Sequence, residues 1–228
     1  MRAAAIIPAY NEAKTVGDVV RTVAASKMFA EIVVVSDGST DDTSRIAKEA
    51  GATLVHEMPW KHGKGAAMGH GVMHADAEAV CFFDADLRGL TVEHVRLLLE
   101  PVLAGERYMN VGLRDRGPFW TALMKALPLV GGERALRREI FDAIPEIYLH
   151  GFKVESALNY FCRVNGLPYG TVVLPGLGIV RKIAKVGWLR GLRQYLGMWL
   201  QVATAMLQVR LAAREFRERG THMSHKHR

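Results

Sequence analysis

The stretch AAAIIPAYNE at Ala3–Glu12 is an apolar run that ends abruptly in polar residues. The same pattern recurs in EIVVVSDGST at Glu31–Thr40 and in AVCFFDAD at Ala79–Asp86. Near-continuous apolar runs of this length are typical of strands that are buried on both faces, as in a parallel sheet. The sequence therefore predicts an α/β fold in which the polar strand ends gather at one edge of the sheet, where such sheets bind ligands.

Helical patterns separate these strands, as a mostly parallel sheet with helices on both faces requires. Helices are expected at Val16–Ala25, Asp42–Ala50, Thr91–Ala104, Pro118–Leu129 and Val154–Val164, with another opened by the glycine-rich stretch Lys61–Gly71. Strands are expected at Ala3–Ile7, Glu31–Val35, Ala52–Val55, Ala79–Phe83, Tyr108–Leu113 and Tyr169–Leu174. The second half of the chain is the less regular one, and no repeat or linker divides it.

Composition and charge narrow the class of protein. Of the 228 residues, 50% are hydrophobic and 23% are charged, which excludes a disordered chain and permits a full core. Two cysteines exclude a disulfide framework or a cysteine-rich zinc cluster. The first residues lack the pattern of a secretory signal, and no uncharged run reaches the ~20 residues that span a bilayer. We therefore expect a cytoplasmic protein.

Basic residues are concentrated at the C-terminus. Residues 1–180 contain 19 Lys/Arg and 21 Asp/Glu, whereas residues 181–228 contain 11 and 2. We expect a catalytic domain at 1–180, a basic amphipathic helical segment at 181–216 that associates with the inner face of the membrane, and a disordered tail at 217–228. A core helix or a dimer contact is the alternative for the middle segment. No nucleic-acid-reading motif is present, and the oligomeric state is open.

Four motifs occur in order along the first half: IIPAYNE at Ile6–Glu12, VVSDGSTDDT at Val34–Thr43, GKGAAM at Gly63–Met68 and FFDADL at Phe82–Leu87. In this combination the chain resembles the family 2 glycosyltransferases of GT-A fold. Within them it is most similar to the polyprenyl-phosphate sugar transferases, such as dolichyl-phosphate mannose synthase. The resemblance implies transfer of a single sugar, with inversion, from a UDP- or GDP-sugar to a polyprenyl phosphate. The alternatives are a soluble hydroxyl acceptor and a non-catalytic module that binds a membrane or nucleic acid.

Asp84 and Asp86 are the candidate metal ligands. Two carboxylates one residue apart at a strand end suit Mg²⁺ or Mn²⁺ bridging a diphosphate. A pair of solvated turn acids is the alternative from spacing alone. Some relatives have a polar ligand where Arg88 stands, and others have a histidine where Ile179 stands, so the resemblance leaves open whether these two positions alter metal dependence.

The resemblance also implies a nucleotide-sugar site. Asp37 would accept a hydrogen bond from the base, although the residues alone also allow an Asx turn. Lys64 follows a glycine at a predicted helix start, which suits an anion. Glu12 would face the ribose or the base, or else act as a helix-start acid. The remaining residues expected to line this site are Pro8, Ala9, Tyr10, Asp84, Ala85 and Asp86.

The acceptor phosphate is expected on arginines, because a guanidinium matches phosphate with two hydrogen bonds. Arg107 in GERY, together with Arg134 and Arg138 in the basic stretch after two glycines, are the candidates, with surface ion pairing as the alternative. Asp86, Arg107, Arg134 and Glu155 form the candidate catalytic set. Glu155 would orient a ligand, act as a base or cap its helix.

The histidines are scattered along the chain. His70 and His74 have i,i+4 spacing on a predicted helix, but the sequence shows no third metal ligand near them. A helix surface is therefore the expected role of this pair.

Overall fold

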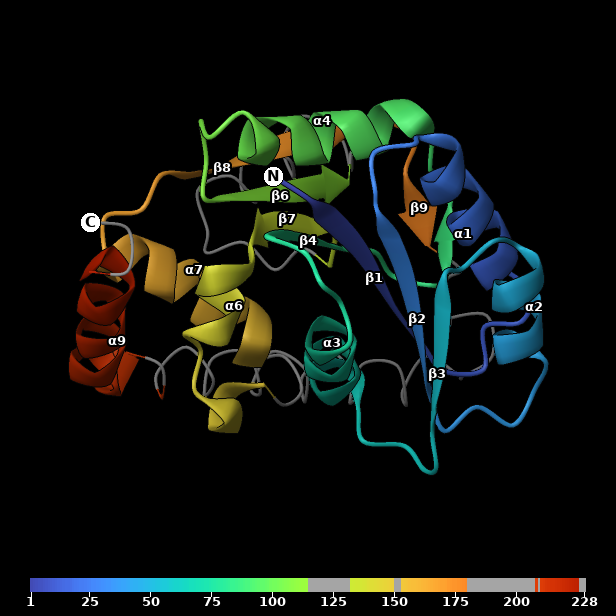
Figure 1. Ribbon diagram of the computed structural model, residues 1–228, viewed down its shortest axis with the longest axis horizontal. Coiled ribbons are helices and arrows are strands. Elements are labelled where there is room, and N and C mark those ends of the chain that lie inside the picture. The colour runs from blue at the N-terminus through green and yellow to red at the C-terminus, as the bar shows by residue number, and fades with distance from the viewer. Residues whose placement is uncertain (115–131, 150–152, 180–207, 209, 226–228) are drawn as a thin grey trace, which may run out of the picture.

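The computed structural model describes residues 1–114, 132–149, 153–179, 208 and 210–225. It is an α/β structure with helices on both faces of a central sheet (Figure 1). In these ranges, seven strands form the main sheet in the order β3-β2-β1-β4-β7-β6-β8. Their bounds are β1 Ala3–Ala9, β2 Glu31–Asp37, β3 Leu54–Met58, β4 Ala79–Phe82, β6 Met109–Arg114, β7 Arg134–Arg137 and β8 Tyr169–Leu174. The predicted fold class is confirmed.

The main sheet is parallel except at β7. β1 runs parallel to β2 and β4, β2 to β3, and β6 to β8, whereas β7 is antiparallel to its neighbours β4 and β6. The carboxyl ends of the other strands therefore reach the same edge of the sheet, which we call the carboxyl edge. The opposite edge is called the amino edge. The polar segments after β1, β2 and β4 meet at the carboxyl edge, as the sequence predicts.

Alternation along the strands builds two cores. Ile6 packs into the core on one face of the sheet and Ile7 into the core on the other, because successive strand residues point to opposite faces. The face of Ile7 is covered by α1 (Val16–Ala25), α2 (Thr43–Glu49) and α4 (Val92–Leu103). The face of Ile6 is covered by α3 (Lys64–Met73), α6 (Arg138–Asp142), α7 (Lys153–Val164) and α9 (Ala213–His225). A 3-10 turn at Glu146–Tyr148 precedes α7.

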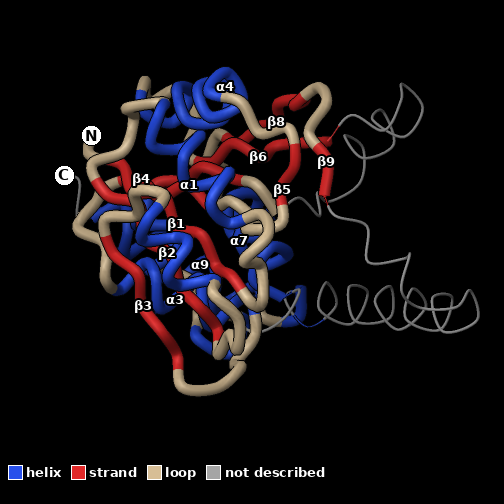
Figure 2. The backbone as a smooth tube through the Cα atoms, turned by 90° about the vertical axis from the view of Figure 1, so that its right-hand side faces the viewer, coloured by secondary structure: helices blue, strands red, loops and turns tan. Residues whose placement is uncertain are grey.

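Two very short strands form a separate ribbon. β5 (Leu87–Arg88) lies antiparallel to β9 (Gly178–Ile179), so a segment directly after Asp86 meets one from nearly a hundred residues later. Figure 2 shows this ribbon at one rim of the molecule. The pairing places Arg88 opposite Gly178 and Leu87 opposite Ile179. Arg88 and Ile179, at which the sequence departs from the pattern of the family it resembles, therefore belong to one ribbon.

The C-terminal residues that the structure describes belong to the folded body. Phe216 of α9 is fully buried, and its ring centroid lies 5.3 Å from that of Tyr148 and 6.2 Å from that of Phe161. The predicted disordered tail is thus wrong for residues 217–225, because the helix that contains them is anchored by this aromatic contact. Most of the predicted membrane segment lies outside the described residues. None of the described helices is both apolar and long enough to cross a bilayer.

The bounds of most predicted elements lie close to those observed. α1 and β8 have the predicted bounds, and β2 runs two residues further than expected. β3 begins at Leu54 rather than Ala52. Strand β7 was not predicted, and the helix expected at Pro118–Leu129 lies outside the described residues.

Candidate functional site

The first two motifs are joined by hydrogen bonds at the carboxyl edge. The Asn11 backbone N–H donates to Ser39 Oγ over 3.1 Å, and the Thr40 N–H donates back to Asn11 Oδ1 over 2.8 Å. The Glu12 N–H donates to Thr43 Oγ1 over 2.9 Å. Asn11 has φ of 54°, a left-handed conformation that asparagine adopts more readily than most residues. The loops after β1 and β2 therefore form one unit, although about thirty residues separate them.

The predicted nucleoside-binding residues of the first motif lie along this unit. Pro8 is half-buried and Ala9 is buried, so these two shape the end of β1. Tyr10 is exposed, and the Nζ of Lys61 lies 3.7 Å from its ring centroid, a cation–π contact. Glu12 is half-buried, and its Oε2 accepts a bond of 3.4 Å from the Thr15 hydroxyl at the start of α1.

Asp37 holds the loop between β3 and α3. Its two carboxylate oxygens accept the backbone N–H groups of His62, at 2.7 Å, and Gly63, at 2.8 Å. Asp37 is 3% exposed. Gly38 has φ of +70°, and a Cβ there would lie 2.6 Å from the backbone carbon of Trp60, so only glycine lets the loop pack this closely. The structure therefore shows Asp37 anchoring this loop, and its predicted contact with a base stays a prediction.

Asp84 is held between two cations just beyond β4. Its Oδ1 lies 2.6 Å from Lys64 Nζ and its Oδ2 lies 3.2 Å from Arg114 Nη2. A Cβ on Gly132 would lie 2.5 Å from Oδ2, so the absence of a side chain there makes room for the carboxylate. Ala85, the predicted neighbour, is buried. The third and fourth motifs therefore meet through an ion pair.

The charges at this position shift the ionisation of their neighbours. Burial alone would raise the pKa of Asp84, but Lys64 and Arg114 outweigh burial and hold the pKa below its ordinary value. Burial opposes the charge of Lys64, yet Asp84 and Glu155 raise the pKa of that amine. Both partners of the 2.6 Å pair are therefore ionised at neutral pH.

Two glutamates complete the cluster. Glu155 opens α7, is 7% exposed, and places Oε1 3.4 Å from Lys64 Nζ. Glu133 Oε1 lies 2.6 Å from Arg114 Nη2. Burial and the nearby Asp84 raise the pKa of Glu133 despite that arginine. We call this group the carboxylate cluster; its members are Lys64, Asp84, Arg114, Glu133 and Glu155.

Arg134 lies beneath the carboxylate cluster. It is 0% exposed, and its Nη1 donates to the backbone carbonyl of Glu155 over 3.4 Å. Burial lowers the pKa of Arg134, with Glu155 the strongest opposing influence. In this conformation a fully buried guanidinium is inaccessible to an acceptor phosphate. The prediction of direct phosphate binding is therefore replaced by support of the α7 start.

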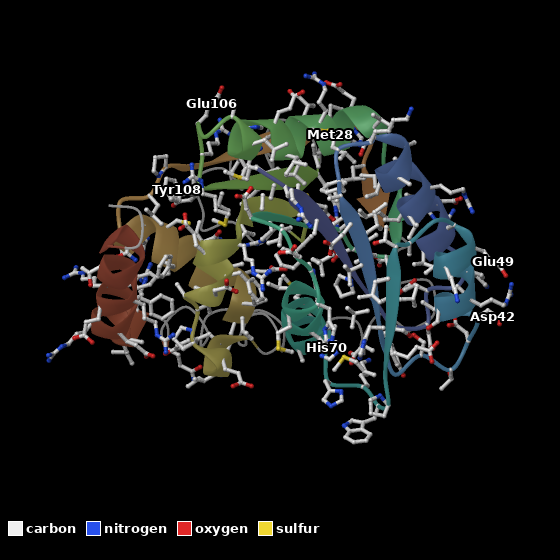
Figure 3. The ribbon with its side chains drawn as sticks, viewed as in Figure 1. Met28, Asp42, Glu49, His70, Glu106 and Tyr108 are labelled. Atoms are coloured by element: carbon white, nitrogen blue, oxygen red, sulfur yellow. The ribbon has the colours of Figure 1, made fainter. Side chains whose placement is uncertain are left out.

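Arg107 and Arg138 lie at the wrong edge of the sheet for the predicted role. Arg107 precedes β6 and donates from Nη1 to Asn110 Oδ1 over 2.6 Å. Figure 3 labels its sequence neighbours Glu106 and Tyr108 at the start of β6. The Arg138 backbone N–H donates to the Glu78 carbonyl over 2.8 Å, just before β4 begins. Both arginines thus belong to the amino edge, which contradicts their assignment to an acceptor phosphate beside Asp84.

Asp86 is the second candidate metal ligand. It is half-buried and stands two positions after Asp84, directly before the β5–β9 ribbon. Mg²⁺ is usually held by one or two carboxylates plus substrate phosphates and water. The two aspartates fit that donor set, although Asp84 is already shared between Lys64 and Arg114. The residues present therefore fit an ion that a bound diphosphate completes.

Sequence reasoning missed Arg114 as a member of the site. The residue ends β6, a strand that is adjacent to β7 rather than to β4. Only the sheet order brings it to Asp84. A basic residue directly after a predicted apolar strand was the available signal.

Comparisons with known proteins agree with this geometry. The model of the family "Glycosyl transferase family 2" matches residues 4–145. The chain is 36% identical over 108 residues to 4,4'-diaponeurosporenoate glycosyltransferase of Staphylococcus aureus (strain USA300), which covers 45% of this chain and 28% of that protein. The chain thus aligns with less than a third of that relative.

Solved structures match over more of the chain. Glucosyl-3-phosphoglycerate synthase from Mycobacterium tuberculosis, in complex with Mn²⁺, UDP and glucosyl-3-phosphoglycerate, superposes with a TM-score of 0.74 at 25% identity, covering 91% of this chain and 79% of that one. Its complex with Mg²⁺ and UDP gives the same TM-score, identity and coverage. The expected resemblance and GT-A fold are confirmed. The family model covers more than half of this chain, which therefore belongs to glycosyl transferase family 2.

Proposed function

We propose that the chain transfers a single sugar from a nucleoside-diphosphate sugar, UDP- or GDP-linked, to an acceptor with inversion at the anomeric carbon. One observation carries the proposal. The four motifs, which are spread over more than eighty residues, meet at the carboxyl edge, with Lys64 joined to Asp84 over 2.6 Å. The family membership and the Mn²⁺–UDP and Mg²⁺–UDP complexes of the structural neighbour support it.

The residues would divide the work as follows. The joined loops after β1 and β2 bind the nucleoside beside Tyr10 and the loop that Asp37 holds. Asp86, with Asp84, holds Mg²⁺ or Mn²⁺, which neutralises charge on the departing diphosphate when bound. Lys64 and Arg114 keep Asp84 ionised and oriented. The acceptor oxygen bonds to the anomeric carbon as the bond to the diphosphate oxygen breaks.

The proposed binding of a nucleoside-diphosphate sugar is tested by thermal shift. The ligands are nucleoside diphosphates and their sugars, with and without Mn²⁺. A ligand that binds only the folded state raises the melting temperature. We expect a shift with one base that grows when Mn²⁺ is present. No shift with any nucleotide, in either condition, would contradict the proposal.

For the acceptor we propose a polyprenyl phosphate. A phosphate monoester has a second pKa of about 6, so it is already a nucleophile near pH 7 and requires no base. The basic composition of residues 181–216 supports a membrane-bound acceptor. We therefore propose that the protein associates with the cytoplasmic face of the membrane. The arginines that first suggested a phosphate acceptor do not add support, because Arg107 and Arg138 lie at the amino edge.

A small soluble hydroxyl acceptor is the second candidate. The structural neighbour that covers 91% of this chain is bound to glucosyl-3-phosphoglycerate, a soluble product. A hydroxyl nucleophile requires a base, and Glu155, whose Oε1 lies 3.4 Å from Lys64 Nζ, is the candidate. An assay that offers both acceptors decides between them. Transfer that needs added polyprenyl phosphate supports the first candidate, and transfer to phosphoglycerate without lipid supports the second.

A further inference from the structure

Three histidines from two elements converge away from the carboxylate cluster. His56 lies on β3, His70 lies on α3, and His74 directly follows the last residue of α3. One nitrogen from each ring can be chosen so that the three atoms all lie within 4.8 Å of one another. The ring centroids are 4.1 Å apart for His56–His70, 4.7 Å for His56–His74 and 4.5 Å for His70–His74. The third ligand that the sequence did not reveal is therefore supplied by the neighbouring strand.

We propose that His56, His70 and His74 bind one Zn²⁺-like transition-metal ion that clamps β3 to α3. Three imidazole nitrogens and a water form a common tetrahedral set for Zn²⁺. With Zn–N bonds of ~2.0 Å, tetrahedral ligand atoms lie ~3.3 Å apart, so the rings need to close by only an ångström or so. We call this group the histidine clamp.

Hydrogen bonding prepares the ring of His74 as a ligand. His74 Nδ1 lies 2.8 Å from the backbone carbonyl of His70, and a carbonyl only accepts, so Nδ1 carries the proton. The lone pair of the neutral ring is then on Nε2, which stays available to a metal. A ligating histidine commonly has its other N–H tied in this way.

The second ring has a buried nitrogen without a partner. His70 Nε2 is inaccessible to solvent and makes no hydrogen bond among the described residues. Leaving such an atom unsatisfied is costly in a folded protein. A metal ion at the centre of the three rings would satisfy it. Figure 3 shows His70 on α3, beside β3.

The site is chemically distinct from the aspartate pair. Asp84 and Asp86 offer hard oxygen ligands, whereas the histidine clamp offers only imidazole nitrogens, which favour Zn²⁺, Co²⁺ or Ni²⁺ over Mg²⁺. Metal binding by the histidine clamp therefore does not depend on sugar transfer. Its consequence is structural, because β3 and α3 are the two ends of the loop at residues 59–63. Asp37 holds His62 and Gly63 at the end of that loop, and a bound ion would hold the strand before the loop against the helix after it.

The test uses the full chain with His222, His225 and His227 replaced by Gln, so that the histidine-rich C-terminus cannot bind metal. Zn²⁺ titration by calorimetry is expected to give one site per chain, and Co²⁺ is expected to give the visible absorption of a tetrahedral nitrogen site. His74→Gln is the first variant, since His74 is exposed and its loss leaves the fold intact. Zn²⁺ affinity should fall at least about tenfold.

His56→Gln should weaken Zn²⁺ binding to a similar extent, because it removes the ligand from the other element. The parent protein in this test is the chain with the three C-terminal replacements. Asp86→Asn is the matched control and should bind Zn²⁺ as tightly as this parent. Zn²⁺ should also raise the melting temperature of the parent and not of His74→Gln. Equal Zn²⁺ affinity in the parent and the two histidine variants, or no binding by the parent, would overturn the proposal.

Discussion

At the scale of single residues, Asp84 and the charged side chains around it organise the site. Two cations contact this carboxylate, and each of them contacts a second acid, Lys64 reaching Glu155 and Arg114 reaching Glu133. Half-buried ions are tolerated only when they are paired, so removing one member leaves another uncompensated. The cluster is therefore sensitive to changes that leave the fold untouched.

Asp86 should be needed for transfer and not for folding. It is half-buried, and two hard oxygen ligands suffice for an ion that also binds diphosphate. Asp86→Ala is expected to lower the transfer rate by about a hundredfold to a thousandfold, in line with the loss of one major transition-state stabiliser. Its urea unfolding midpoint should match that of the parent. Undiminished turnover would remove the metal-bridge mechanism.

Asp37 gives a prediction in which stability and ligand binding change together. Asp37→Ala leaves the buried N–H groups of His62 and Gly63 without their acceptor, at about 1–3 kcal/mol for each unsatisfied group. Asp37→Asn keeps one oxygen and should lose less. Chemical denaturation measures the ranking, and nucleotide affinity should fall in the same order. Equal stability of the two variants would contradict the loop-anchoring role.

Glu133 predicts a pH dependence. Its pKa is raised in the folded protein, so the folded state binds more protons than the unfolded state above the unfolded pKa of about 4.3. The free energy of unfolding should therefore fall as pH rises from that value through the folded pKa. In Glu133→Gln this fall should be absent, whereas the loss of stability below pH 4 that Asp84 causes should remain. Urea titrations of both proteins at several pH values measure the difference.

At the scale of elements, the apolar strands were predictable and β7 was not. β1, β2 and β4 are almost wholly buried runs, so hydrophobicity alone identifies them. β7 has four residues, RALR, and Arg134 within it is completely buried. Charged residues in a short segment predict solvent exposure. Arg134 is buried because the folded protein places acidic partners near it, which the segment itself does not reveal. The placement of Arg107 and Arg138 failed for a different reason, which is strand direction. Arg107 precedes β6, and Arg138 follows the antiparallel β7, so both lie at the amino edge.

Helix α3 predicts opposite effects for two of its glycines. A Cβ at Gly71 would lie 2.4 Å from Ile6 Cγ2, so Gly71→Ala forces the helix away from the sheet and should cost about 1–3 kcal/mol. A Cβ at Gly69 would make an ordinary contact of 3.6 Å with Leu149 Cδ1. Gly69→Ala should then stabilise the protein by about 0.5–1 kcal/mol through helix propensity. Thermal unfolding of the pair measures both signs, and destabilisation by both would contradict the packing argument.

At the scale of the whole molecule, charge is divided between a nearly neutral body and a basic C-terminal segment. The end of that segment is tied to the body, since Phe216 packs against α7 and the Asn165 side-chain amide donates to the Phe216 carbonyl over 3.1 Å. α7 also begins with Glu155 of the carboxylate cluster. Helix α7 thus connects α9 with the carboxylate cluster. We propose that the basic segment at 181–216 associates with an anionic membrane.

Binding to anionic vesicles tests this arrangement in the full chain. Each Lys or Arg near an anionic surface contributes about 1 kcal/mol, so replacing Arg181, Lys182 and Lys185 by Gln should cost about 3 kcal/mol, or roughly a hundredfold in partitioning. The matched control replaces Arg21, Arg45 and Arg96 by Gln, which removes the same charge from exposed ion pairs of the body. Co-sedimentation should show strong, salt-sensitive binding for the parent and the control, and little for the first variant. Equal loss in both variants would mean that net charge, rather than the C-terminal segment, holds the protein to the surface.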